Sequence, residues 1–284
     1  MKVIKTVAEM QSWSKKIKNQ GKTICLVPTM GYLHRGHLSL IEMGKKLLYD
    51  KVVVSIFVNP AQFGENEDLD SYPSDLEKDF KLAEKLTTDA IFLPLKEEIY
   101  NKNFQTYVEL ASLPDHLCGL SRPVHFKGVA TIVTKLFNIV CPDAAIFGQK
   151  DYQQLQVIRQ MTKDMNFNIK ILGAPIVREE DGLAMSSRNT YLTPEQRESA
   201  LCLSESIEKA KTIIGQGETD AGIILKKINA HIKSFAEAKI DYTALCDPDT
   251  LDNVKEIKKK TLLALAVQIG KTRLIDNAVI DPEQ

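Results

Sequence analysis

The sequence of 284 residues is long enough for one large domain or two smaller ones, each with its own hydrophobic core. Hydrophobic residues make up 44% and charged residues 26%, which is ordinary for a globular protein and argues against extensive disorder. Lys plus Arg and Asp plus Glu both number 37, so the formal charge is zero and no general basic field is available to attract nucleic acid.

The sequence shows no signal for export or for membrane insertion. No apolar run approaches the length of a membrane span, and residues 1–13 lack the apolar centre of a signal peptide. The five cysteines are scattered and none forms a C-x-x-C pair, which suits reduced and mostly buried thiols. A catalytic cysteine remains open, although cysteines occur far more often in a core. We expect a cytoplasmic protein without a membrane or nucleic-acid partner.

The segments up to about residue 176 alternate between two apolar patterns. Short apolar runs, several of them rich in β-branched residues, predict buried strands at residues 23–27, 52–58, 90–93, 144–147 and 169–172. Apolar patterning and length predict helices at residues 36–49, 74–86, 128–140 and 151–165. Alternating strands and helices are typical of a parallel sheet with right-handed crossovers. Ligands of such sheets bind beyond the carboxyl ends of the strands.

The pattern changes after residue 176. Helices are predicted at residues 194–214 and 220–236, and strands at residues 240–246 and 262–269. Thr193 is a suitable helix N-cap, because Pro194 follows it at the first helical position. We therefore predict an α/β fold, with a Rossmann-like parallel-sheet domain at residues 1–176 and a smaller α+β domain at residues 177–284.

Two short segments resemble the end of a phosphate-binding P-loop. They are Gly21-Lys22-Thr23 and Gly270-Lys271-Thr272. The earlier glycine that the motif requires is replaced by Lys16 in one and Leu265 in the other, so both are interpreted as turns beside strands. No G-x-G-x-x-G follows a predicted strand, which counts against a nicotinamide enzyme.

The segment Pro28–His37, with the sequence PTMGYLHRGH, runs from the end of the first predicted strand into a helix. A helix N-terminus offers backbone N–H groups and a partial positive charge, which suits phosphate. Gly31 and Gly36 allow close approach of a nucleotide, and His34 lies three residues before His37, so both rings can face one side and donate to phosphate. A zinc site would need a third ligand nearby, and ordinary surface histidines are the other alternative.

Four sequence blocks resemble a known family. His34-Arg35-Gly36-His37 is similar to the H-x-G-H signature of the adenylate-forming and nucleotidyl-transferring superfamily, which includes class I aminoacyl-tRNA synthetases. The blocks are Pro28–His37, Val58–Phe63, Phe147–Gln154 and Asp181–Asn189. Together they resemble the pantoate–β-alanine ligase family. The resemblance implies ATP-dependent condensation of (R)-pantoate with β-alanine through a pantoyl-adenylate, giving (R)-pantothenate, AMP and pyrophosphate for coenzyme A biosynthesis.

The ATP-binding candidates come from three of these blocks and one further position. They are Met30, Gly31, Tyr32, Leu33, His34, Arg35, Gly36, His37, Gly148, Gln149, Lys150, Asp151, Val177, Met185, Ser186, Ser187 and Arg188. The predicted catalytic residues are His37, His34 and Lys150, with His37 the preferred donor to the developing pyrophosphate and Lys150 a compact charge for phosphate. Asp151 could accept a hydrogen bond from the ribose. The resemblance alone implies that the backbone at Val177 meets the adenine.

The polar loop Met185–Arg188 resembles the mobile second signature of the synthetases. Two hydroxyls and a guanidinium are all phosphate donors, and Gly182 before them could act as a hinge. We therefore expect the domain at residues 177–284 to form a lid over the active site.

Two glutamines are the candidates for the acid substrate. The resemblance implies that Gln62 and Gln154 bind pantoate and that Gln62 also meets β-alanine, because an amide both donates and accepts without adding charge. Asn59 and Tyr72 are weaker candidates for the same pocket. We expect Mg²⁺ to be bound mainly through the nucleotide phosphates, without a protein metal site, and the resemblance implies a homodimer.

Two residues depart from the family pattern. Val124 stands where a glycine is frequent, and Gln149 stands where a glutamate is more usual. Two other functions stay open from H-x-G-H alone. A nucleotidyltransferase would need a basic pocket for a phosphorylated acceptor, whereas a non-catalytic nucleotide sensor would bind ATP without turnover. The neutral glutamines favour a small hydroxy acid over a phosphorylated acceptor.

Overall fold

The computed structural model describes residues 1–65 and 67–283, which fold into two units. The first comprises Met1–Ala111, Arg122–Gln149 and Gln154–Pro175, and the second comprises Ser112–Ser121, Lys150–Gln153 and Ile176–Gln284. The change of pattern near residue 176 lies at the last of these boundaries. The segments Ser112–Ser121 and Lys150–Gln153 differ from the predicted domains, because they belong to the second unit although they lie within residues 1–176.

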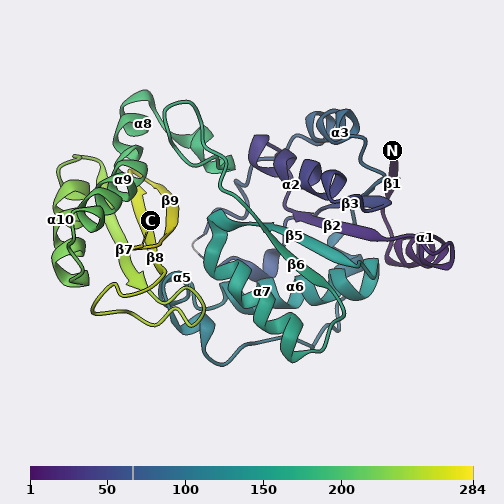
Figure 1. Cartoon of the computed structure of the whole chain (residues 1–284). Coiled ribbons are helices and arrows are strands. Elements are labelled where there is room, and N and C mark those ends of the chain that lie inside the picture. The colour runs from purple at the N-terminus through teal and green to yellow at the C-terminus, as the bar shows by residue number, and fades with distance from the viewer. Residues whose placement is uncertain (66, 284) are drawn as a thin grey trace. The chain divides into compact units, whose positions relative to one another are not determined.

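A parallel sheet of six strands, counted among the described residues, forms the centre of the first unit (Figure 1). The strands are β1 (Lys2–Ile4), β2 (Ile24–Thr29), β3 (Lys51–Ile56), β4 (Ala90–Phe92), β5 (Ala144–Gly148) and β6 (Lys170–Ala174), in the order β1-β4-β3-β2-β5-β6. The central strand β2 pairs with β3 on one side and β5 on the other, so the winding reverses between β2 and β5. Such a reversal creates the ligand crevice of a parallel sheet at the carboxyl ends of the strands. The predicted Rossmann-like sheet is confirmed.

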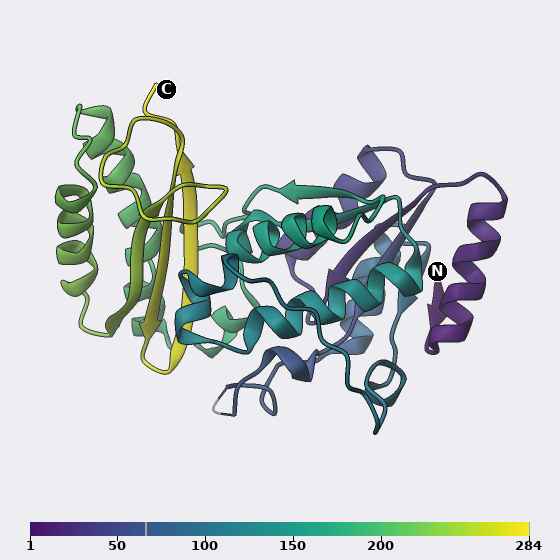
Figure 2. The ribbon, with the colours of Figure 1, turned by 90° about the horizontal axis from the view of Figure 1, so that it is seen from below.

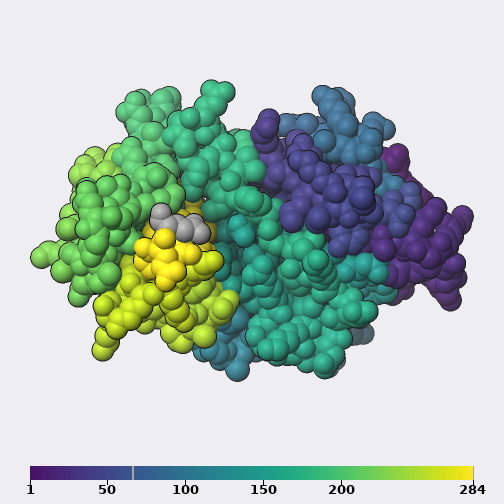
Figure 3. Space-filling model, viewed as in Figure 1, coloured from purple at the N-terminus to yellow at the C-terminus, as the bar shows by residue number. Residues whose placement is uncertain are grey.

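Helices cover both faces of this sheet (Figure 1). One face packs against α1 (Val7–Asn19), α6 (His125–Val140) and α7 (Tyr152–Asp164), and the other against α2 (Arg35–Lys46) and α3 (Leu76–Lys85). Alternate side chains of β2 serve the two faces: Ile24 and Leu26 belong to the first core, and Cys25 and Val27 to the second. All four are fully buried. Figure 3 shows the same side of the molecule in space-filling form, with the first residues of the chain in purple.

The first two elements, β1 and α1, were not predicted. β1 is a three-residue strand that pairs with β4, and α1 buries Met10, Ser14 and Ile17 among many charged residues, so its apolar period is weak. α1 nevertheless begins at a regular cap, where the Thr6 hydroxyl accepts the Glu9 backbone N–H at 3.3 Å. The shorter elements are η1 (Pro60–Gln62), α4 (Lys96–Ile99), η2 (Leu113–Asp115), α5 (Cys118–Ser121), η3 (Gln149–Asp151) and η4 (Ser187–Tyr191).

The second unit has a separate core between helices and an antiparallel sheet (Figure 2). Its larger elements are α8 (Pro194–Ala200), α9 (Cys202–Gly215), α10 (Ala221–Lys233), β7 (Ala238–Cys246), β8 (Thr261–Ile269) and β9 (Thr272–Ile280). The strands lie in the order β7-β8-β9, and the helices cover one face of the sheet. The predicted cap is confirmed, since the Thr193 hydroxyl accepts the Gln196 N–H at 3.2 Å and Pro194 begins α8.

Two predictions for this unit were wrong. The single helix predicted at residues 194–214 is divided at Leu201 into α8 and α9, and β9 was missed. β9 contains Asp276 and Asn277, which are unfavourable in strands, and their burial depends on tertiary partners. The two P-loop look-alikes are turns as interpreted, since Gly21 has φ 72° and precedes β2 while Gly270 has φ 56° and joins β8 to β9.

The cysteines are free thiols, and all except Cys141 are buried. Burial raises the pKa of Cys25, Cys202 and Cys246 to about 12, which makes them unreactive near neutral pH. Within residues 1–65 and 67–283, no helix combines the length and apolar character needed to cross a membrane.

Gly128 allows α6 to lie directly against η1. A Cβ added to Gly128 would fall 2.2 Å from the backbone oxygen of Ala61, closer than any real contact. The backbones of α6 and η1 therefore approach each other in a way that only glycine permits. This contact fixes the position of Gln62, the last residue of η1.

We expect Gly128→Ala to lower the free energy of unfolding by about 1–3 kcal/mol, because an extra methyl group must displace backbone rather than a flexible side chain. Urea denaturation would measure the loss. Gly64→Ala is the matched control in the same unit, since its added Cβ would meet Glu67 at an ordinary distance of 3.5 Å. Equal stability of the two variants would contradict the backbone contact.

Candidate active site

His34 and His37 lie at the amino-terminal end of α2, just beyond β2. His34 is the N-cap, and the two rings stack with their centroids 4.0 Å apart. The prediction that both rings lie on one side of the helix start is confirmed. In the described part of the chain, no three His, Cys, Asp or Glu side chains gather into a group that could hold a metal ion.

Backbone N–H groups fix the proton position on each ring. The Nδ1 atom of His34 accepts the Gly36 N–H at 3.1 Å, and the Nδ1 atom of His37 accepts the His34 N–H at 3.4 Å. A neutral imidazole that accepts at Nδ1 carries its proton at Nε2. Both rings can therefore donate from Nε2 while uncharged, which suits a hydrogen bond to a phosphate oxygen.

The turn that leads into these histidines is held by Asp79, a fully buried residue of α3. Its carboxylate accepts the backbone N–H of Tyr32 at 2.8 Å and of Leu33 at 2.6 Å. Gly31 and Tyr32 have φ of 86° and 51°, and the second value is unfavourable for a tyrosine. Burial raises the pKa of Asp79, although the two N–H groups oppose this effect. The carboxylate thus stabilises a strained turn.

The remaining members of the same segment differ in what they expose. Leu33 is buried in the core between the sheet and α2, so its backbone alone is available to a ligand. Arg35 is exposed, whereas Met30 and Gly36 are half-buried. A nucleotide at this turn would therefore meet mainly backbone and histidine.

Gln62, the predicted acid ligand, lies beside Met30 of this segment. Its Nε2 approaches the Sδ of Met30 at 3.2 Å, which brings η1 next to the turn after β2. Its Oε1 accepts from Asn59 Nδ2 at 3.0 Å, and the same nitrogen donates to the Gly128 carbonyl at 3.1 Å. Gln62 and Asn59 are both buried. Tyr72, the other weak candidate, packs edge-on against Phe63.

Arg122 and His125 both contact the backbone carbonyl of Gln62 at the end of η1. Arg122 forms an ion pair with Glu67, and its Nη2 donates to the Gln62 carbonyl at 3.3 Å; the His125 Nδ1 lies 3.0 Å from the same oxygen. Burial raises the pKa of Glu67, but Arg122 outweighs burial and the pKa lies below its ordinary value. Val124, which departs from the family pattern, has φ −88° and an exposed side chain, so its position does not require glycine.

The end of β5 carries the second group of candidates. A Cβ added to Gly148 would meet no atom within 4 Å, so the backbone there is open to a ligand. Gln149 is half-buried, and its Cγ lies close to Gly173 of β6. Gln154 is half-buried in the first turn of α7. Gln153 instead has a structural role, because its amide donates to two carbonyls of the 112–121 segment and accepts the Cys118 N–H.

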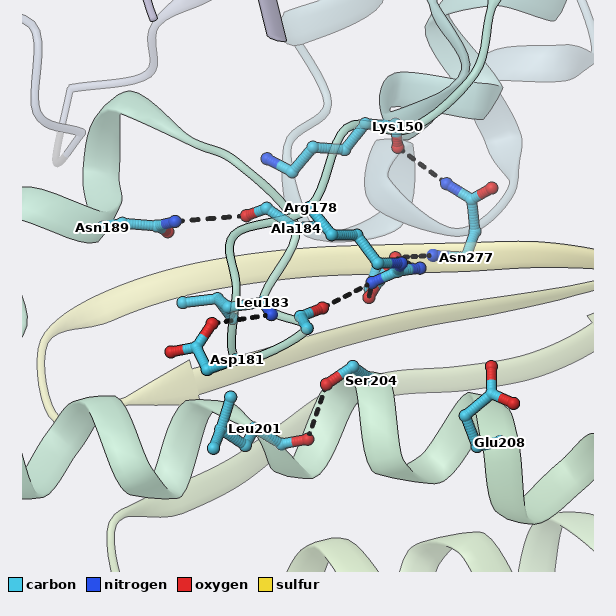
Figure 4. A network of polar contacts seen from close by, with 12 residues as sticks. Lys150, Arg178, Asp181, Leu183, Ala184, Asn189, Leu201, Ser204, Glu208 and Asn277 are labelled. Carbon is cyan, nitrogen blue, oxygen red and sulfur yellow. Dashed lines mark hydrogen bonds and ion pairs between the residues drawn. The ribbon is translucent and has the colours of Figure 1, made fainter. Parts of the chain in front are cut away.

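Lys150 is anchored through its backbone in the second unit. Asn277 of β9 donates to the Lys150 carbonyl at 2.8 Å, and the lysine side chain extends away from that contact (Figure 4). Burial lowers the pKa of Lys150, whereas the carboxylates of Asp151 and Asp276 oppose the shift and Arg188 adds to it. Lys150 and the polar loop Met185–Arg188 belong to the same unit.

The polar loop continues from a short hairpin. The Met185 N–H donates to the Val177 carbonyl at 3.0 Å, and Gly182 occupies the turn with φ 92°. Gly182 is therefore required by the turn, whereas its predicted role as a hinge is untested. The Ser186 hydroxyl caps η4 by accepting the Arg188 N–H at 3.3 Å, and Ser187 is buried.

Two side chains hold this hairpin in place (Figure 4). Arg178 donates to both oxygens of the buried Asp276 at 2.6 and 3.0 Å. Asn189 donates to the Glu179 carboxylate at 2.6 Å and to the Ala184 carbonyl at 3.1 Å. Hydrogen bonds thus connect Met185 to Val177, and Arg178 connects the same hairpin to Asp276 of β9.

Sequence reasoning missed several residues that hold these groups, among them Asp79, Asn277 and Asp276. One signal was available: Leu76, Phe80 and Ala83 form the apolar side of α3, and Asp79 falls within that stripe. An acidic residue in an apolar stripe indicates a buried partner. The other two gave no signal, because their partners are distant in sequence.

Comparison with known proteins gives a consistent result over the whole chain. The sequence profile of the pantoate-beta-alanine ligase family matches residues 2–279. The pantothenate synthetase of Desulforapulum autotrophicum is 60% identical over 284 residues, covering 100% of both chains. The crystal structure of pantothenate synthetase from Thermus thermophilus superposes with a TM-score of 0.93 at 40% identity, covering 98% of this chain and 99% of that one.

A second solved structure is the pantoate-beta-alanine ligase of Francisella tularensis, described as complexed with beta-gamma ATP and beta-alanine. It has a TM-score of 0.81 and 35% identity, and covers 100% of this chain and 98% of that one. The profile match and the high identity over full length leave one assignment: the chain belongs to the pantoate-β-alanine ligase family.

Proposed function

We propose that this ATP-dependent ligase, which condenses pantoate with β-alanine, works through a pantoyl-adenylate. A carboxylate and an amine do not condense at neutral pH, so the acid must first be activated. The pantoate carboxylate attacks the α-phosphorus of ATP and pyrophosphate leaves. The amine of β-alanine then attacks the acyl carbon, and AMP leaves. The observation that carries the proposal is that the Nδ1 atoms of His34 and His37 accept backbone N–H groups, which leaves Nε2 of each ring as the donor, while Gln62 contacts Met30 in the same segment.

The histidines and the turn before them are proposed to bind the triphosphate. His37 would donate from Nε2 to the departing pyrophosphate, and His34 would donate to a neighbouring oxygen. The backbone of residues 30–36 would line the nucleotide, and Gly148 would leave room for it. A helix N-terminus adds a favourable potential for phosphate. Preorganised donors of this kind stabilise the transition state without rearrangement.

The second unit is proposed to act as a lid that supplies the remaining ATP ligands. They are Lys150, Asp151, Val177, Met185, Ser186, Ser187 and Arg188. Two facts support this assignment: these residues belong to one unit, and the chain enters that unit at Lys150, two residues after the end of β5. Gln149 would line the ribose or phosphates from the first unit.

Gln62 and Gln154 are proposed to bind pantoate, and Gln62 to meet β-alanine as well. Gln62 suits this role because Asn59 donates a hydrogen bond to its Oε1. Its Nε2 is then directed toward Met30, in the turn after β2. A donor there could hold a carboxylate or hydroxyl oxygen without adding charge. Asn59 and Tyr72 would complete the pocket, Asn59 by orienting Gln62 and Tyr72 through its contact with Phe63.

Magnesium is proposed to arrive with the nucleotide and to be held mainly by phosphate oxygens. Most of the proposed nucleotide ligands are hydrogen-bond donors, with Asp151 the one carboxylate among them, which suits a metal bound through its substrate. We also propose a homodimer, on the strength of the family resemblance, and a cytoplasmic location, which the free and mostly buried cysteines support.

Isotope tracing tests the adenylate. Pantoate labelled with heavy oxygen in its carboxylate should transfer one labelled oxygen to AMP, because that oxygen bridges the acyl carbon and phosphorus in the intermediate. Mass spectrometry of AMP measures the transfer. Label in inorganic phosphate together with ADP formation would indicate an acyl-phosphate and overturn the proposal.

His37→Ala should lower kcat by about a hundred- to a thousandfold, as expected when one preorganised donor to a developing charge is removed. Steady-state assays of AMP release would measure the loss. His231→Ala is the control, because His231 lies on α10 and pairs with Glu205 at the surface. A rate for His37→Ala equal to that of the control would remove His37 from the mechanism.

Lys150 should produce an alkaline limb in the pH profile, along which kcat/KM for ATP falls as the pH rises. Because burial lowers the pKa of Lys150 below 10.5, rising pH removes its proton earlier than for an ordinary lysine, and the phosphate donor loses its charge. We expect kcat/KM for ATP to fall along this limb in the wild type. In Lys150→Arg the guanidinium stays protonated, so the limb should move to higher pH. An unchanged limb in that variant would assign it to another group.

A further inference from the structure

A row of buried polar contacts reaches Gln62 from a residue that neither the family blocks nor the candidate ligands include. The Tyr100 hydroxyl donates to Asn59 Oδ1 at 2.7 Å. Asn59 Nδ2 donates in turn to Gln62 Oε1 at 3.0 Å, and Gln62 Nε2 lies against the Sδ of Met30. The row therefore connects Tyr100, through two amides, to the turn that carries the histidines.

The directions of these hydrogen bonds follow from the groups that surround Asn59. Its Nδ2 has two hydrogens, and both are used, one by the Gly128 carbonyl at 3.1 Å and one by Gln62. A reversed Asn59 amide would place its oxygen against the Gly128 carbonyl, where two acceptors repel. The Asn59 oxygen must then face Tyr100, whose hydroxyl is its donor. Asn59 is 1% exposed, so water does not compensate for a missing partner.

The ring of Tyr100 is held on several sides. Phe57 and Phe104 lie with ring centroids at 6.2 and 4.9 Å, and the Lys135 ammonium lies 5.9 Å from the Tyr100 centroid. Burial raises the pKa of Tyr100 above its usual range, so the hydroxyl keeps its proton at every pH at which the enzyme is assayed. A fixed ring with a permanent proton makes a directional donor.

We propose that Tyr100 is a positioning residue for the acid substrate: its hydroxyl, acting through Asn59, fixes the Gln62 amide with Nε2 toward the substrate. This proposal rests on the proposed role of Gln62. Without the hydroxyl, Asn59 Oδ1 loses its buried donor, and the Gly128 carbonyl alone still orients the Asn59 amide. Asn59 then holds the Gln62 amide less firmly, and a Gln62 amide turned by 180° presents its oxygen to a carboxylate and repels it. Tyr100 thereby affects binding of the acid without touching it.

Tyr100→Phe tests the inference, since it removes the hydroxyl and leaves the ring contacts in place. We expect KM for pantoate to rise about five- to twentyfold, the effect of one lost buried hydrogen bond, with KM for ATP unchanged. Tyr107→Phe is the matched control, because Tyr107 lies in the same aromatic row against Phe104 but is 50% exposed. A simple loss of folding would lower the yield of active enzyme and leave both KM values unchanged.

A double-mutant cycle separates the two proposals. Gln62→Ala alone should raise KM for pantoate, and adding Tyr100→Phe should then produce no further rise, because the hydroxyl acts through Gln62. If Gln62→Ala leaves KM unchanged, the proposed acid site fails. If Gln62→Ala raises KM but Tyr100→Phe does not, or if the two effects simply add, the positioning role of Tyr100 is overturned.

Asn59→Asp gives an independent test that keeps the Tyr100 hydroxyl. An aspartate accepts from Tyr100 but cannot donate to Gln62, so KM for pantoate should rise at least as much as in Tyr100→Phe. The same assay measures both variants. An unchanged KM for pantoate in Asn59→Asp would show that Gln62 is not oriented through Asn59, and would overturn the inference.

Discussion

The hydrogen bonds from the buried carboxylate of Asp79 to the turn after β2 are the constraint on which the site depends. That turn must reverse the chain within a few residues so that α2 begins beside the carboxyl end of the central strand. The left-handed φ of Tyr32 shows that the local sequence does not favour this path. Two charge-assisted hydrogen bonds to the N–H groups of Tyr32 and Leu33 offset the strain. The stacked histidines follow from the turn, because His34 becomes the N-cap.

Most of the candidate ligands in the first unit are uncharged groups. The proposed donors to the phosphates are imidazoles and backbone N–H groups, and the proposed acid site is built from amides, so these roles do not require burying an unpaired charge. Where charges are buried, they are paired: Asp79 with backbone N–H groups and Arg122 with Glu67.

Two of the boundaries between the two units fall within η3 and within the first turn of α7. The chain leaves the first unit at Gln149 and returns at Gln154, and the four residues between include Lys150 and the structural Gln153. Asn277 of β9 fixes the Lys150 backbone, and Asp276 beside it fixes Arg178 and the hairpin that precedes the polar loop. Neighbouring residues of one strand thus hold both groups that the second unit is proposed to offer to ATP.

The sequence by itself determined much about this protein: strands β2 to β6 of the parallel sheet and the cap at Thr193 followed from patterns within about fifteen residues. The blocks around His34, Gln62, Lys150 and Arg188 also indicated the family, because the ligands of a reaction are encoded in contiguous segments. Local patterns failed for β1, whose pairing with β4 decides its existence, and for β9, whose polar residues need distant partners. Only the tertiary structure decided how the candidate side chains are oriented. Asp79 and the turn it holds are 46 and 47 residues apart, and Tyr100 and Asn59 are 41 apart. The proton position on each histidine, the direction of the Gln62 amide and the membership of Lys150 in the second unit all depend on the tertiary fold. A hydrogen bond between distant residues does not alter the pattern of apolar residues in either segment. Sequence patterns can therefore identify the candidate groups of a site but cannot predict their orientation.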